Sequence, residues 1–105
     1  MKKLLTVTFF LAFSSAAFAD GAADIWKAKC KGCHGDDGAG KTKVGIKEKV
    51  DDLSNPEWQA KHSDEKIRTV IAEGSKDNSK MKPFKDKLSA EEIDSLVAYI
   101  RTLKK

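Results

Sequence analysis

The sequence lacks the patterns that enzymes and nucleic-acid-binding proteins carry. Its 105 residues contain no phosphate-binding glycine loop, no nucleophile paired with a base and no paired carboxylates in an apolar setting. No aromatic stripe is interleaved with arginines. Internal repeats and the glycine-punctuated alternation typical of sheets are absent too. We therefore expect one small helical domain that is not an enzyme and does not bind nucleic acid.

Cysteine is scarce, and the two cysteines lie together. Cys30 and Cys33 belong to the run CKGCH at residues 30–34. A C-x-x-C-H run is typical of covalent haem attachment. Each thiol can add to one vinyl group, and the adjacent imidazole of His34 can ligate the iron. The run therefore predicts one covalently attached haem c, with His34 as an iron ligand.

Three other uses of the cysteine pair are open. A thioredoxin-like redox pair would need a strand–helix–strand pattern around it, and none is present. A zinc site needs four nitrogen or sulfur ligands. The chain offers two cysteines, His34 and His62, and His34 is too close to Cys33 for an easy tetrahedron. A disulfide between Cys30 and Cys33 is sterically possible but leaves His34 without a role.

Residues 1–19 have the pattern of a secretory signal peptide. Lys2 and Lys3 precede a mostly apolar run, and residues 17–19 form an A-x-A cleavage pattern. The uncharged stretch at residues 4–19 is shorter than the ~20 residues of a membrane span. We expect residues 20–105 to be an exported periplasmic domain without stable membrane insertion. This agrees with the haem motif, because such attachment takes place outside the bacterial cytoplasm.

Removal of the signal peptide leaves a small and nearly neutral domain. The net charge falls from +4 to +2 when Lys2 and Lys3 are lost, so it gives no reason to expect nucleic-acid binding. A domain of this size has a marginal core without a stabilising group. A bound haem would supply a flat apolar surface, so we expect the haem-free chain to be largely unfolded.

Helices and loops account for residues 20–105. The first helix is expected at residues 22–31, and three glycines at residues 35–40 require a loop. Residues 41–49 indicate a loop with one helical turn. Pro56 and Ser63 mark two further helix starts, and Gly74 marks a stop. A capping box of Ser89 and Glu92 predicts the last helix. Apolar stripes support the last two helices: Ile67, Val70 and Ile71, then Ile93, Leu96, Val97 and Ile100.

A second axial ligand would complete the iron site. Met81 is the only methionine outside the signal segment, and it lies in a polar loop that is a poor place for core filler. A thioether suits low-spin iron and raises its reduction potential. His62, which we expect to be exposed, would instead give bis-imidazole ligation and a lower potential. An open position that binds a small gas or peroxide is the third possibility.

These features resemble the class I c-type cytochromes, which are small single-haem electron carriers. The resemblance covers nearly all of residues 20–105 and rests on CKGCH, on the GDDGAG loop at residues 35–40 and on Met81 before a C-terminal helix. It implies an all-α cytochrome c fold, with three to five short helices wrapped around one haem c. It also implies that His34 is the proximal ligand and Met81 the distal one.

Weaker matches and two departures accompany this resemblance. Ala22 and Trp26 are similar to the family positions that cross the last helix, here near Leu96 and Tyr99. Residues 52–58 are similar to the segment before the third helix in bacterial members. Many members have proline directly after the ligand methionine, and a second proline whose carbonyl orients the ligand histidine. Both prolines are missing here. In place of the second one, we expect a carbonyl within residues 43–46 to accept from Nδ1 of His34.

The predicted function is that of a soluble, monomeric one-electron carrier, because a six-coordinate iron has no vacancy for substrate. The alternative is a haem-based sensor or small-ligand-binding protein with a labile or absent Met81 bond. Lysines flank both haem-binding segments and favour periplasmic or membrane-bound redox partners with acidic docking surfaces. An ordinary solvated surface would show the same charges. These lysines are Lys27, Lys29, Lys31, Lys80, Lys82, Lys85 and Lys87.

Overall fold

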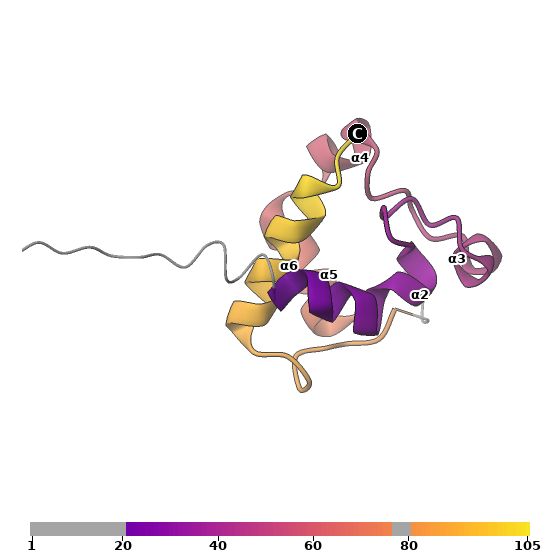
Figure 1. Ribbon diagram of the computed structural model, residues 1–105. Helices are drawn as coiled ribbons and strands as arrows, with labels where there is room; N and C mark the ends of the chain where they lie inside the picture. Colours follow the sequence, from indigo (N-terminus) through magenta and orange to yellow (C-terminus); the bar gives the residue numbers. More distant parts are fainter. Residues whose placement is uncertain (1–20, 77–80) are drawn as a thin grey trace, which may run out of the picture.

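A computed structural model describes residues 21–76 and 81–105, and every regular element in these ranges is a helix (Figure 1). The predicted signal peptide at residues 1–19 and Lys80 lie outside the described residues. The all-α prediction is confirmed. The first helix comprises residues 21–25, the π-turn η1 (Trp26–Cys30) and α2 (Lys31–His34). The others are α3 (Lys43–Glu48), α4 (Pro56–Lys61), α5 (Asp64–Glu73) and α6 (Ala90–Thr102).

Side-chain caps fix the starts of the later helices where the sequence predicted them. The side chain of Asn55 accepts from the backbone N–H of Glu57 at 2.7 Å, and Ser63 caps α5 in the same way. Ser89 and Glu92 form the predicted capping box at α6. Each cap satisfies backbone donors that have no partner inside the helix. Gly74 ends α5 with φ +85°, a conformation that favours glycine.

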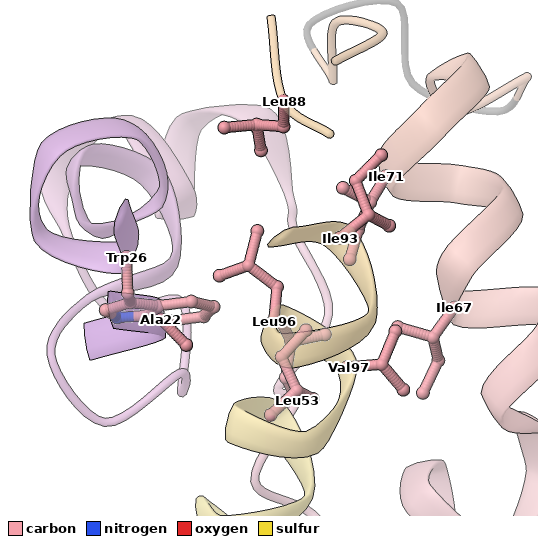
Figure 2. Close-up of a cluster of buried hydrophobic side chains, with 10 residues drawn as sticks. Ala22, Trp26, Leu53, Ile67, Ile71, Leu88, Ile93, Leu96 and Val97 are labelled. Atoms are coloured by element: carbon pink, nitrogen blue, oxygen red, sulfur yellow. The ribbon is translucent and has the colours of Figure 1, made fainter. Parts of the chain in front are cut away.

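The first helix crosses α6 through Ala22 and Trp26, as the family resemblance implies (Figure 2). Ala22 is fully buried, and Trp26 and Leu96 are each 1% exposed. The rings of Trp26 and Tyr99 lie 5.5 Å apart at 46°. A small residue and a large aromatic one thus let the two helices approach closely at their crossing.

The pairing of α5 with α6 builds the other half of the core. Ile71 lies beside Ile93, and Ile67 beside Val97 (Figure 2). The stripe predicted for α5 is wrong at Val70, which is 40% exposed. On a helix with 3.6 residues per turn, positions 67 and 71 are nearly aligned, whereas position 70 falls to one side.

Arg101 joins the end of α6 to α4 and α5. Its guanidinium donates to the carbonyl oxygen of Gln59 at 2.8 Å, to that of His62 at 2.6 Å and to Asp64 at 2.8 Å. The side chain of Gln59 in turn donates to the carbonyl of Ile100 at 2.9 Å. These bonds satisfy polar groups that the packing of three helices would otherwise leave without partners.

Candidate functional site

The CKGCH run is helical, and its first residue ends a π-turn. The N–H of Lys31 donates to the carbonyl of Trp26, five residues earlier, and closes η1. Single π-turns inside α-helices are frequent at functional sites. Cys30 is the last residue of η1, and Cys33 and His34 lie in α2. The sequence predicted a helix only to residue 31, whereas the structure continues it to His34, and the sequence gave no signal for the π-turn.

Both cysteines are free thiols, and both are half-buried. Burial raises the pKa of the Cys30 thiol to about 11, against the opposing effect of Lys29. Cys30 is therefore protonated at neutral pH, whereas catalytic and redox-active cysteines depend on a lowered pKa. No three His, Cys, Asp or Glu side chains within residues 21–76 and 81–105 are grouped to hold a metal. The thiol-redox and zinc alternatives therefore have no support in this structure.

Three successive carbonyls at the end of the run are held by three different donors. The hydroxyl of Thr42 donates to the carbonyl of Cys33 at 2.9 Å, and the N–H of Gly40 donates to that of His34 at 2.9 Å. The indole Nε1–H of Trp26 donates to the carbonyl of Gly35 at 2.8 Å, and this bond is buried. These three hydrogen bonds thus fix the backbone before, at and after the predicted iron ligand His34.

Glycine makes this close packing possible at two positions. Gly40 has φ +73°, and a Cβ there would lie 2.6 Å from Val50. A Cβ on Gly45 would lie 2.3 Å from the carbonyl oxygen of Cys33. The loop glycines at residues 35–40 were predicted, but the role of Gly45 and of Thr42, which caps α3, was missed. A threonine just before a helical turn was the available signal.

His34 carries the most informative atom of the site. Its Nδ1 is buried and is the only buried side-chain N or O atom in the described residues without a hydrogen-bond partner. Burial lowers the pKa of His34, with Asp51 opposing, so the ring is neutral at pH 7. A neutral imidazole is the form that binds metals. The neutral ring fits a haem-ligand role through Nε2, and the lone Nδ1 is the atom for which a carbonyl acceptor was expected.

The acceptor expected for His34 within residues 43–46 is not found. The carbonyls of Gly45 and Ile46 already accept from the backbone of Val50 and Lys49, which close α3 at its C-terminal end. Nδ1 of His34 therefore has no hydrogen-bond partner in the described residues.

Met81 is held against the end of α5. Its carbonyl accepts from the N–H of Ser75 at 3.2 Å, and Phe84 donates to the carbonyl of Ile71 at 2.9 Å. The side chain is half-buried and packs against the core, although its neighbours in the sequence are polar. The structure does not itself pair the thioether with His34.

His62 is half-buried rather than exposed as predicted. Its ring stacks on Trp58 at 4.3 Å, and its Nδ1 lies 2.8 Å from the carbonyl of Trp58. Since a carbonyl only accepts, Nδ1 must carry the proton in this bond. The contacts of His62 are thus with α4, and none of them joins it to His34.

The flanking lysines are at the surface. Lys27, Lys29, Lys82 and Lys87 are exposed, while Lys31 pairs with Asp36 at 3.4 Å and Lys85 pairs with Glu73 at 3.2 Å.

None of the helices in the described part of the chain is long and apolar enough to cross a membrane.

Known proteins are similar to this chain in sequence and fold. Residues 17–100 match the family described as "Cytochrome C oxidase, cbb3-type, subunit III". Among solved structures, the chain is similar to the KustC0563 c-type cytochrome, with 40% identity and a TM-score of 0.73 over 80% of this chain and 98% of that one. A mutant of Kustc0563 is similar at 39% identity, with a TM-score of 0.71 over 80% of this chain and 99% of that one. No curated protein gives a significant match.

Proposed function

The chain belongs to the cbb3-type cytochrome c oxidase subunit III family of small c-type cytochromes, whose cofactor is haem c, and we propose that it is a periplasmic one-electron carrier. The haem would be attached through Cys30 and Cys33 and ligated by His34 and Met81. When bound, the haem supplies a one-electron couple at its iron. The protein residues hold the group, orient its ligands and keep water away from it.

One observation carries the assignment to these residues. A neutral, half-buried imidazole lies in the same five-residue helical run as two free thiols. Thiols add to vinyl groups, and a neutral imidazole ligates iron. The hydrogen-bonded carbonyls of Cys33, His34 and Gly35 support this role, because a rigid backbone limits rearrangement when the redox state changes.

Met81 is the proposed second ligand because its side chain is a thioether and because hydrogen bonds hold its loop in place. A thioether is a fitting ligand for low-spin iron. The hydrogen bonds of Ser75 and Phe84 hold its loop against α5, so the side chain has a defined position beside the core. His62 is a weaker candidate, since its ring is already engaged by Trp58.

Export to the periplasm is proposed from the signal pattern at residues 1–19. A pair of free cysteines in an oxidising compartment would tend to form a disulfide. Attachment of both sulfurs to a haem removes that outcome. The partners proposed are redox proteins with acidic faces, because the lysines that flank both segments would attract them.

The test is an absorption spectrum of the purified, haem-loaded protein and its Met81→Ala variant. We expect the oxidised wild type to show the red charge-transfer band of a thioether–iron bond, and the variant to lose it. His62→Ala is the matched control and should keep the band. The reduced wild type should resist carbon monoxide. A band that survives Met81→Ala would refute the ligand assignment, and ready carbon monoxide binding would indicate a sensor instead.

A further inference from the structure

The last turn of α5 is capped by the segment that carries Met81. A helix leaves its last four carbonyls without a partner of its own. The N–H of Phe84 donates to the carbonyl of Ile71 at 2.9 Å. The N–H of Lys85 donates to the carbonyl of Ala72 at 3.1 Å. The segment that begins at Met81 is therefore bonded along the end of the helix.

Gly74 is the residue at which this segment comes closest to the end of α5. Its φ of +85° and ψ of 169° lie in a region that is essentially restricted to glycine. A Cβ on Gly74 would lie 2.8 Å from the carbonyl oxygen of Met81 and 3.3 Å from the backbone nitrogen of Pro83. Both neighbours are backbone atoms, which cannot rotate away. Met81 can occupy its place beside α5 because residue 74 has no side chain.

A hydrogen bond fixes the same carbonyl from the side of α5. The N–H of Ser75 donates to the carbonyl oxygen of Met81 at 3.2 Å. Lys82 stands where many c-type cytochromes have proline, so no ring fixes the backbone directly after Met81. In this chain the restraint on Met81 comes from the end of α5, through the donor at residue 75 and the missing side chain at residue 74.

We propose that Gly74 is a positioning residue for the second iron ligand, because it sets how closely the backbone of Met81 approaches α5 and so where the thioether lies. The proposal rests on the proposed ligation by Met81 and adds the residue that controls it. A ligand that is already held in place loses little conformational entropy when it binds. A side chain at residue 74 would press on the backbone of Met81, and release of the thioether from the iron would relieve that contact.

A glycine at a helix end is ordinarily a stop signal, and that role needs only a positive φ. Gly38 shows the difference. Its φ is +77°, and a Cβ on it would meet Cδ1 of Leu103 at 2.9 Å. That atom is the tip of a side chain, which can rotate away. At Gly74 the corresponding neighbour is the backbone of the proposed ligand itself, so a substitution there acts on Met81 directly.

The test measures imidazole binding to the oxidised, haem-loaded protein, followed by loss of the red charge-transfer band of the thioether–iron bond. Added imidazole can ligate the iron only when the thioether has left it, so its affinity reports how firmly Met81 is held. We expect Gly74→Ala to raise this affinity about tenfold or more. Gly38→Ala is the matched control, also at a positive φ, and should change it by less than about twofold. Urea unfolding of both variants separates this effect from a general loss of stability.

A second pair of variants leaves Gly74 in place. Ser75→Pro removes the N–H that donates to Met81, and the extended ψ of Gly74 is compatible with a following proline. We expect it to raise the imidazole affinity about fivefold, from the loss of one hydrogen bond. Ser75→Ala keeps the N–H and should change the affinity by less than about twofold. This pair decides the question if Gly74→Ala does not yield haem-loaded protein.

Two kinds of result would overturn the positioning role alone. One is a wild-type band that is lost in Met81→Ala, together with unchanged imidazole affinity in Gly74→Ala and Ser75→Pro. The other is an equal rise in affinity in Gly74→Ala and Gly38→Ala, which would indicate general destabilisation. A wild-type band that is absent, or that survives Met81→Ala, would instead overturn the ligand assignment and the role of Gly74 with it.

Discussion

The indole of Trp26 links the packing of the fold to the haem-attachment segment. Its Nε1–H donates a buried 2.8 Å hydrogen bond to the carbonyl of Gly35, the residue directly after His34. The same ring packs against Tyr99 of α6 and lies 5.7 Å from the ring of His34. The helix crossing that forms the core therefore also holds the backbone next to the predicted iron ligand.

Trp26→Phe should destabilise the haem-loaded protein by about 2–3 kcal/mol, from one lost buried hydrogen bond and a smaller ring. Denaturant unfolding followed at the haem absorbance measures this. Trp58→Phe is the control, since the Nε1 of Trp58 donates at the exposed surface to Asp51, at 3.1 Å. Its cost should be below about 1 kcal/mol. Equal losses of stability in the two variants would show that the buried Trp26–Gly35 bond contributes no more than the exposed Trp58–Asp51 bond.

Gly45→Ala should prevent α3 from packing on the CKGCH segment, because the new Cβ would meet the carbonyl of Cys33 at 2.3 Å. We expect a loss of about 3 kcal/mol or more in stability, and a lower yield of haem-loaded protein. Gly32→Ala places the same methyl group where nothing lies within 4 Å. That control should be neutral or slightly stabilising in a helix. Normal stability and haem yield in Gly45→Ala would disprove the close contact.

Arg101→Met should cost about 2 kcal/mol, because the carbonyls of Gln59 and His62 would lose a charged donor. Methionine keeps much of the apolar stem, so the comparison isolates the lost hydrogen bonds. Arg68→Met is the control, because it removes only an exposed ion pair with Asp94. Its cost should stay below about 1 kcal/mol. Thermal unfolding of the haem-loaded variants separates the two cases.

Asp52 should contribute a pH-dependent part of the stability. Hydrogen bonds from Ser54 hold the pKa of this carboxyl below its ordinary 3.8. A carboxyl with a lower pKa in the folded protein stabilises the fold above its unfolded pKa, and this contribution is lost as the pH falls through the folded pKa. Ser54→Ala should therefore cost stability at neutral pH and progressively less in acid below pH 3.8.

The control for this pH dependence is Ser95→Ala. The hydroxyl of Ser95 donates to the carbonyl of Glu92 at 2.7 Å, which does not titrate. Its cost should be constant with pH in urea unfolding experiments. A cost of Ser54→Ala that does not change between neutral and acid pH would show that the Asp52 interaction is not the cause.

Local signals explain what the sequence could predict. Helix starts depend on single capping residues, so those at Pro56, Ser63 and Ser89 were correctly placed. The fold class followed from helical spacing, because Leu96 and its neighbours form one buried stripe on α6. The haem motif could be recognised because its chemistry is confined to five consecutive residues. Its ligand assignments remain predictions.

Contacts between distant segments explain what the sequence could not predict. The Trp26–Gly35 bond depends on where an indole points after two helices have packed. The approach of Gly45 to Cys33 is invisible until α3 is placed. His62 was expected to be exposed, but it stacks on Trp58 and is half-buried. These features require three-dimensional positions that spacing along the chain does not contain.

The most direct test is the mass of the peptide that contains residues 30–34, isolated by proteolysis of the purified, exported protein. The account predicts this peptide plus one haem, retained under denaturing conditions because both sulfurs are bonded to it. A peptide of unmodified mass, or one bearing a Cys30–Cys33 disulfide, would contradict it.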